Sequence, residues 1–261
     1  MSNNSGPVAL VTGSSKGIGR SIAETLAAKG YRVIVTSRGA DAANEAAAQI
    51  SQGGAEVTGI QFDIDDESSV RDLIANTHAK WGRLDVLVNN SPSAQLVLPA
   101  VNIEYQTLQT AITNGFTNTF FVTLQAFDLL KKSGGCVINI ASSVTRRHLM
   151  GLAIYRIAKG ALVEMTKTLA AEWASAGVRV NAINPGFIRT TAFSSMGMDD
   201  ATIEKSYAFY DSYQPLGGVG KPEAIAEATA YLASKSAAMI TGTILDVDGG
   251  YSVNGLPLYS Q

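Results

Sequence analysis

Short apolar runs rich in valine and isoleucine alternate along the chain with longer alanine-rich segments. The apolar runs predict seven strands, over residues 8–12, 32–37, 56–62, 85–89, 136–141, 179–184 and 243–247. Apolar residues at helical spacing predict helices over residues 17–29, 41–50, 67–81 and 103–132. Continuously apolar strands are buried on both faces, and strand–helix alternation implies right-handed crossovers. The pattern therefore predicts an α/β fold, with a doubly wound seven-stranded parallel sheet and helices on both faces.

One region does not follow this pattern. Residues 191–215 mix Met, Phe, Tyr, Ser and Gly irregularly, and aromatic residues cluster at Phe209, Tyr210 and Tyr213. Irregular segments on a rigid scaffold often carry binding residues. We predict that this segment is a substrate loop or lid. Because neither an internal repeat nor a low-complexity linker is visible, we expect one domain over residues 1–261.

Composition and charge exclude several classes of protein. Hydrophobic residues make up 46% of the 261 and charged residues 16%, so a large core is expected rather than disorder. The net charge is −2 and no long basic run occurs, which argues against nucleic acid or an anionic membrane as a partner. The polar start MSNNSGP does not resemble a signal peptide, and no apolar stretch approaches the roughly 20 residues of a membrane span. We expect a cytoplasmic protein.

Metal and thiol chemistry are not expected either. The chain has one cysteine, Cys136, inside the apolar run CVINI, and two histidines, His78 and His148. A lone cysteine among apolar residues is typical of a buried core position. With so few histidine and cysteine ligands, we predict no metal site.

The segment TGSSKGIG (12–19) lies between the first predicted strand and the first predicted helix. Glycines there allow a tight turn and a close approach of the backbone to a pyrophosphate. The helix N-terminus adds N–H donors and a partial positive charge. A strand–turn–helix context makes this glycine pattern much more specific than glycines alone. We predict a phosphate cradle for a dinucleotide.

A second motif is YRIAK, which places Tyr155 and Lys159 four residues apart. On a helix these residues share a face, with Cβ atoms roughly 5–6 Å apart. A neighbouring lysine cation favours the phenolate form of tyrosine. Such a phenol can give a proton to a carbonyl oxygen, or accept one in the reverse reaction. The pair therefore predicts an acid/base device.

Taken together, TGxxxGxG and YxxxK are similar to the motifs of the short-chain dehydrogenase/reductase family, in particular to members resembling 3-oxoacyl-(acyl-carrier-protein) reductases. The resemblance runs over nearly the whole chain, with further matches in FDID (62–65), VNN (88–90), NIAS (139–142), NPGFIRT (184–190) and TGTILDVDGG (241–250). It implies a single Rossmann-type domain, a nicotinamide cofactor, hydride transfer and a homo-oligomer, usually a tetramer.

The resemblance also implies roles for single residues. It makes Ser142, Tyr155 and Lys159 the catalytic residues, with Lys159 also bonding the nicotinamide ribose. Ser143 is the alternative serine, but NIAS and the spacing of thirteen residues before Tyr155 favour Ser142. Besides Tyr155 and Lys159, the residues implied to bind the cofactor are Gly13, Ser15, Lys16, Gly17, Ile18, Gly19, Arg38, Asp63, Ile64, Asn90, Pro185, Gly186, Ile188 and Thr190. Of these, Asp63 and Ile64 are implied to contact the adenine, with Asn90 beneath it. Ile188 and Thr190 are implied to contact the carboxamide of the nicotinamide.

The second predicted strand bears on the choice of nicotinamide. An acidic residue at its end would bond the adenosine ribose and repel a 2′-phosphate. By family alignment this position is Ser37, followed by Arg38, while Lys16 lies in the glycine loop. Two cations at one pocket favour a phosphate through charge-assisted hydrogen bonds. We therefore predict NADPH/NADP+ as the cofactor.

The chain departs from the family at two places. The family usually has NNAG where this chain has NNSP (89–92), and proline lacks an N–H, so we expect a reshaped loop. The family also places a proton-relay asparagine where Gly115 aligns here, with Asn114 one residue away and Asn118 nearly one turn on. Asn114 would serve only if the helix were kinked or bulged, which Gly115 would permit. The sequence leaves this choice open.

The function predicted is NADPH-dependent reduction of a ketone, such as a 3-oxoacyl thioester, to a secondary alcohol. Two alternatives stay open, an NAD-dependent alcohol or sugar dehydrogenase and a cofactor-binding regulatory protein with weak catalysis. Residues expected near the substrate are Ser93, Gln95, Arg146, Arg147, His148, Met150 and Phe187. The basic run at 146–148 would suit an anionic substrate, although a solvated loop explains it equally well.

Overall fold

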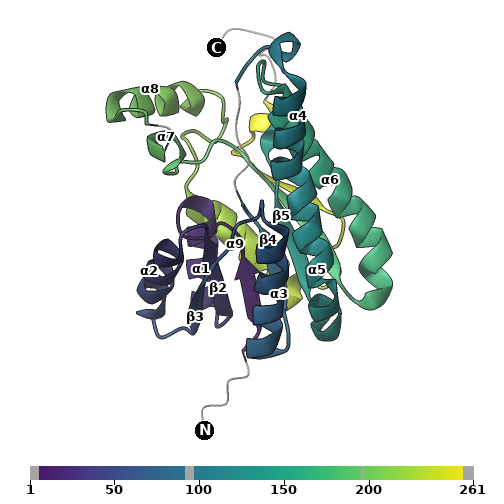
Figure 1. Cartoon of the computed structure of the whole chain (residues 1–261). Helices are drawn as coiled ribbons and strands as arrows, with labels where there is room; N and C mark the ends of the chain where they lie inside the picture. The colour runs from purple at the N-terminus through teal and green to yellow at the C-terminus, as the bar shows by residue number, and fades with distance from the viewer. Residues whose placement is uncertain (1–5, 92–96, 196, 255–261) are drawn as a thin grey trace.

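The computed structural model describes residues 6–91, 97–195 and 197–254, which surround a seven-stranded parallel sheet (Figure 1). The strands are β1 (Val8–Val11), β2 (Arg32–Ser37), β3 (Val57–Gln61), β4 (Val86–Asn89), β5 (Cys136–Ile140), β6 (Arg179–Pro185) and β7 (Ile244–Val247). Their order is β3-β2-β1-β4-β5-β6-β7. The predicted strands and fold class are confirmed, each strand to within one residue at either end.

Helices cover both faces of the sheet because side chains alternate along each strand. Leu10 of β1 packs into one core and Val11 into the other. The first core lies beneath α3 (Glu67–Trp81), α5 (Asn118–Ser133) and α6 (Ala153–Trp173). The second lies beneath α1 (Gly17–Ala28), α2 (Ala40–Ser51) and α9 (Pro222–Ala233). The described residues also form five short 3₁₀ turns: η1 (Ala100–Asn102), η3 (Ser143–Thr145), η4 (Ala174–Ala176), η5 (Lys235–Ala237) and η6 (Tyr251–Val253).

Cys136 begins β5 and is buried in the second core, which confirms its predicted core position. Burial raises the pKa of its thiol to about 11, because the low-dielectric interior disfavours the thiolate. The thiolate is the nucleophilic form of cysteine. At neutral pH this residue therefore packs as a small hydrophobe.

The helix predicted over residues 103–132 is interrupted. It consists of α4 (Tyr105–Ile112), a π-helical turn η2 (Thr113–Thr117) and α5. Gly115 is buried within the π turn, which packs against α6. A π turn widens the helix locally, as expected for an extra residue inserted into its hydrogen-bond ladder. The bulge that Gly115 would permit is therefore present.

The irregular region after β6 contains two helices, α7 (Ala192–Ser195) and α8 (Asp200–Asp211). Asp199 caps α8, since its carboxylate accepts a hydrogen bond of 2.8 Å from the backbone N–H of Thr202. Both helices stand apart from the two helical layers, beyond the carboxyl ends of the strands at the upper left of Figure 1. They are placed where a cover for the sheet edge would lie.

The described residues offer neither a membrane span nor a metal cluster. No helix in that part of the chain combines the length and the apolarity that crossing a bilayer requires. No group of three or more His, Cys, Asp or Glu side chains suited to a metal ion occurs there either.

Candidate active site

The strand order reverses between β1 and β4, so the crossovers on either side of this point run in opposite directions. In open parallel sheets, ligands bind outside the carboxyl ends of the strands at such a switch point. The predicted site residues follow these ends: the glycine loop after β1, Asn90 after β4, Ser142 after β5 and residues 186–190 after β6. The sheet thus gathers at one edge residues that lie far apart in sequence.

The glycine loop turns sharply between β1 and α1. Gly13 and Gly17 both have φ of 61°, in the left-handed region that glycine tolerates best. A Cβ at Gly19 would clash with the Asn90 amide nitrogen and would lie 2.5 Å from the Gly13 carbonyl oxygen. The loop is therefore packed backbone against backbone, as a close phosphate cradle requires.

Hydrogen bonds tie this loop to its neighbours. The Asn90 amide donates to the carbonyls of Thr12 and Gly13 at 3.1 and 3.0 Å. The backbone N–H of Asn90 donates to the Thr12 hydroxyl at 2.9 Å. On the other side, Gly13 N–H donates to the Thr36 hydroxyl at 3.0 Å. The cradle is fixed from both adjacent strands before any ligand binds, and its residues fit the pyrophosphate of a dinucleotide.

Residues predicted for the adenosine end flank the cradle. Lys16 occupies the N-cap position of α1 and Arg38 follows β2, and both side chains are exposed. Asp63 and Ile64 follow β3 and are half-buried. The Asp63 carboxylate accepts a hydrogen bond of 3.1 Å from Asp65 N–H, which folds the loop back on itself. Side chains that suit a 2′-phosphate and an adenine are thus present beside β2 and β3.

Ser142 directly follows β5, in extended backbone with φ of −169° and ψ of 149°. Its hydroxyl accepts a weak hydrogen bond of 3.4 Å from Val144 N–H. Ser142 is half-buried, whereas Ser143 is only 4% exposed. Accessibility therefore favours Ser142 as the serine that meets a substrate.

Tyr155 and Lys159 lie in the first turns of α6. The Lys159 ammonium lies 5.8 Å from the centre of the Tyr155 ring and donates a 2.9 Å hydrogen bond to the Ile140 carbonyl at the end of β5. Lys159 is buried, so its cation acts through a medium less polar than water. The pair sits beside the strand that leads to Ser142.

Arg156, inside the YRIAK motif, was not predicted as a site residue. Its guanidinium donates hydrogen bonds to the carbonyls of Val144 and Thr145, the latter at 3.3 Å. These carbonyls belong to the turn that begins after Ser142. Arg156 therefore fastens the start of α6, with Tyr155, to the segment that carries the serine.

The loop after β6 closes the site. Gly186 has no room for a side chain, because a Cβ would clash with the Gln214 amide oxygen and would lie 2.6 Å from Asp248 Cα. Ile188 forms a parallel bridge with Gly220. A Cβ on Gly17 would lie 3.8 Å from the Thr190 Cβ, so the glycine loop and Thr190 face each other. The segments that follow β1 and β6 thus meet at the switch point.

Helix α8 is attached to this loop by three kinds of contact. The buried Tyr207 hydroxyl accepts from Thr190 N–H at 3.1 Å and donates to the Thr190 carbonyl at 3.0 Å. Arg189 pairs with Glu204 through its two terminal guanidinium nitrogens, Nη1 and Nη2. This pairing lowers the pKa of the Glu204 carboxyl. The Phe187 and Tyr210 rings stack with centroids 4.1 Å apart. The aromatic cluster was predicted to matter from the sequence, whereas the Tyr207 contact was not.

The two arginines of the basic run at 146–148 both contact other residues of the protein. Arg146 pairs with Asp246 at 3.2 Å. Arg147 lies over the Tyr251 ring at 5.1 Å and donates to the Tyr251 carbonyl. An anionic substrate would have to compete with these partners, so the idea that the run attracts anions loses support.

Asn114 and Asn118 both face Asp65. Asn118 donates to the Asp65 carboxylate at 2.8 Å, and the Asn114 amide nitrogen, oriented toward its acceptors, lies 3.2 Å from the same carboxylate. Asn114 in the π turn and Asn118 at the start of α5 thus both face the loop after β3. The alignment of Gly115 with the relay asparagine stays a prediction. Pro92, Ser93 and Gln95 lie outside the described residues.

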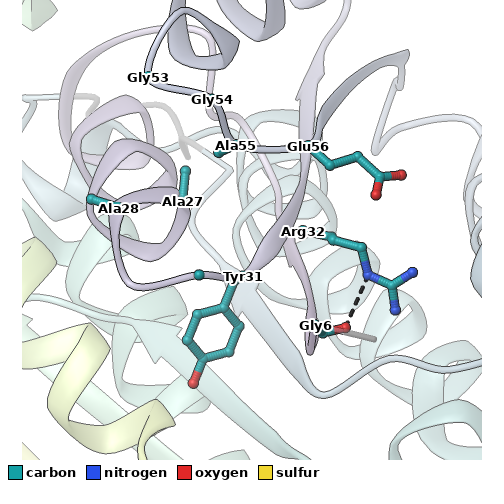
Figure 2. A pocket seen from close by; sticks show the side chains of 10 residues that line it. Gly6, Ala27, Ala28, Tyr31, Arg32, Gly53, Gly54, Ala55 and Glu56 are labelled. Carbon is teal, nitrogen blue, oxygen red and sulfur yellow. Dashed lines mark hydrogen bonds between the residues drawn. The ribbon is translucent and has the colours of Figure 1, made fainter. Parts of the chain in front are cut away.

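A shallow pocket of about 390 Å³ lies at the opposite edge of the sheet (Figure 2). Glycines and alanines line it, and the Arg32 guanidinium donates to the Gly6 carbonyl at 2.9 Å. Among the described residues that line it, none belongs to the predicted site. It sits where β1 and β2 begin, so it is not the candidate active site.

The chain is similar to known proteins over most of its length. A family model described as Enoyl-(Acyl carrier protein) reductase matches residues 13–252. The 3-oxoacyl-(acyl-carrier-protein) reductase FabG of Escherichia coli (strain K12) is 37% identical over 251 residues, 95% of this chain and 98% of that protein.

Two solved structures share the fold over nearly their whole length. One is a short-chain type dehydrogenase/reductase from Mycobacterium marinum, with a TM-score of 0.85 and 29% identity over 95% of this chain and 96% of that one. The other is a single-residue variant of actinorhodin polyketide ketoreductase with NADPH, with a TM-score of 0.88 and 29% identity over 97% of this chain and 99% of that one.

Proposed function

Because this chain belongs to the short-chain dehydrogenase/reductase family of oxidoreductases, we propose that it reduces a ketone to a secondary alcohol with NADPH. The observation that carries the proposal is the Lys159 ammonium beside the Tyr155 ring, on the helix fastened to the turn after Ser142. The relative from Escherichia coli is named a 3-oxoacyl reductase, and the ketoreductase structure holds NADPH. Both names support reduction of a carbonyl.

Each of the three residues has a distinct task in the proposal. When bound, a reduced nicotinamide supplies the hydride that adds to the carbonyl carbon. Ser142 donates a hydrogen bond to the carbonyl oxygen and fixes its direction. Tyr155 gives that oxygen a proton as negative charge develops on it. Lys159, whose ammonium lies beside the Tyr155 ring, would hold the nicotinamide ribose.

The substrate class is proposed to be a 3-oxoacyl thioester or a related ketone. The test is NADPH consumption against 3-oxoacyl thioesters, diketones and cyclic ketones, each with an enzyme-free blank. We expect turnover on one of these classes. Inertness across the whole panel, with NADPH still bound, would instead favour a cofactor-binding protein with weak catalysis.

The proposed preference for NADPH rests on Lys16 and Arg38. Two exposed contacts with a phosphate, at about 0.2–1 kcal/mol each, correspond to a preference of about two- to thirtyfold over NADH. Replacing Arg38 with alanine should weaken NADPH binding and leave NADH binding unchanged, as measured by fluorescence titration. Lys167→Ala on the far part of α6 is the control for lost positive charge. Equal dissociation constants for NADH and NADPH in the parent protein would exclude the preference.

We further propose that α7 and α8 form the substrate lid, held by Tyr207. In Tyr207→Phe the ring is retained but both hydrogen bonds to the Thr190 backbone are lost. At about 0.5–1.5 kcal/mol per bond, the two bonds together contribute about 1–3 kcal/mol. The Michaelis constant for the ketone should therefore rise about 5- to 150-fold, as steady-state kinetics will measure.

Tyr210→Phe is the matched control for the lid. It removes a hydroxyl from the same helix but keeps the stack on Phe187. Among the described residues this hydroxyl makes no hydrogen bond. Identical kinetics of the Tyr207 and Tyr210 variants would show that the Tyr207 hydroxyl does not hold the lid.

A homo-oligomer is also proposed, with a tetramer implied by resemblance. Large apolar side chains are exposed just before and along α4, with Val101 93% and Tyr105 73% exposed. Exposed apolar clusters of this kind are typical of surfaces that a partner covers.

A further inference from the structure

A polar network lies behind Ser142 and takes no part in the mechanism above. Its centre is Asn184 of β6, which is fully buried, and its outer end is Asp246 of β7, the residue paired with it in the sheet. The Asn184 amide nitrogen donates to the Asp246 carboxylate at 2.7 Å. The network therefore connects the edge strand of the sheet to its interior.

Asn184 and Thr145 together hold both peptide groups that flank the Ser142 side chain. The Ser142 N–H donates to the Asn184 amide oxygen at 3.2 Å. The Ser142 carbonyl accepts from the Thr145 N–H at 3.0 Å and from its hydroxyl at 2.9 Å. The same hydroxyl accepts from the Asn184 amide nitrogen at 3.0 Å. Fixing both peptide groups fixes the direction in which the serine hydroxyl leaves the chain.

Asp246 determines which way the Asn184 amide points. An amide presents a donor on one side and an acceptor on the other, whereas an ionised carboxylate only accepts. The Asn184 nitrogen must therefore face Asp246, and its oxygen is left to face the Ser142 N–H. Arg146 holds the carboxylate in turn, with its Nε 3.2 Å from both Asp246 oxygens.

We propose that Asn184 and Asp246 are positioning residues for the reduction, which keep the backbone of Ser142 in the conformation that aims its hydroxyl at the carbonyl oxygen. The inference rests on the proposed function, because the network affects the reaction only through the proposed role of Ser142. Neither residue touches the substrate or the cofactor in this account.

The test is a double-mutant cycle between Asp246→Asn and Ser142→Ala. An asparagine at position 246 keeps the size of the side chain but offers a donor as well as an acceptor, so the Asn184 amide loses one of the contacts that fix its orientation. In the parent background we expect kcat to fall about tenfold, with the KM for NADPH unchanged. In the Ser142→Ala background the same change should leave kcat unaltered, because residues that act as a unit are not additive.

A structural role would give a different pattern. Equal losses from Asp246→Asn in both backgrounds, or no loss in the parent, would overturn the inference while Ser142→Ala alone still reported on the proposed function. If Ser142→Ala itself were silent, the catalytic role of Ser142 would fail, and the inference with it. Asp72→Asn, at an exposed position of α3, controls for the lost negative charge. If the Asp246→Asn variant does not bind NADPH, Arg146→Gln replaces it in the same cycle. The Arg146 side chain is half-exposed and holds the Asp246 carboxylate.

Discussion

Replacing Tyr155 with phenylalanine is expected to lower kcat for ketone reduction by about 10²–10⁴-fold while NADPH still binds. The variant keeps the ring beside the Lys159 ammonium, and Lys159 keeps its hydrogen bond to the Ile140 carbonyl. Only the hydroxyl that is proposed to supply the proton is removed. The measurement is NADPH consumption on the substrate class found active with the parent protein, together with a fluorescence titration of NADPH.

The control for this variant is Tyr231→Phe, which removes a half-exposed tyrosine hydroxyl from α9, away from the site. It should reduce ketones as fast as the parent. If the Tyr155 variant also kept the parent rate, the proton would come from another group and the proposed mechanism would be wrong. If parent and variant both bound NADPH and reduced nothing, the interpretation as a cofactor-binding protein would gain support.

Gly19→Ala is expected to remove most cofactor affinity and to destabilise the fold. The added Cβ would meet the Gly13 carbonyl oxygen at 2.5 Å, and this oxygen belongs to the backbone of the cradle itself. Overpacking of this kind typically costs about 1–3 kcal/mol. We expect NADPH binding to weaken by at least about tenfold, since the loop that must approach the phosphates is displaced. Calorimetry should show a melting temperature lower by a few degrees.

Gly53→Ala provides the matched comparison. Gly53 is exposed after α2, and a Cβ there would make only an ordinary contact of 3.6 Å with the Ile50 carbonyl oxygen. Its stability should stay within about 0.5 kcal/mol of the parent, with NADPH affinity unchanged. If Gly19→Ala bound NADPH as tightly as Gly53→Ala, the loop after β1 would not be the phosphate cradle.

The sequence predicted all seven strands, and it predicts a strand most clearly where every residue of that strand is buried. All residues of β1 are buried, so its apolar run is continuous and its identity clear. In α8, by contrast, Tyr207 is the one buried residue among those described, and an amphipathic pattern can hardly emerge from a single position. The π turn was foreseen only as a possibility, because it depends on where backbone hydrogen bonds shift and not on a residue pattern.

The residues of the candidate site also fall into those that the sequence predicted and those that it did not. Tyr155 and Lys159 were predicted because four-residue spacing on one helix fixes their proximity. Asn184 and Asp246 were not, because 62 residues separate them and only the pairing of β6 with β7 makes them neighbours. Arg146 was considered for an anionic ligand, yet its partner is a carboxylate 100 residues away in the chain. Contacts between strands need the sheet order, which a single sequence does not contain.

The hydrogen bonds from Arg156 to the Val144 and Thr145 carbonyls also predict which backbone amides exchange slowly with solvent. Amide protons exchange through local openings, which take place in contiguous cooperative units. The proposed lid is attached through Tyr207 and Glu204 to the loop after β6, whereas the segments that carry Ser142 and Tyr155 are joined through Arg156. The amides of α8 should therefore exchange early and those at the start of α6 late. If the proposed lid opens in this way, substrate would enter and leave without Ser142 and Tyr155 having to reassemble at each turnover.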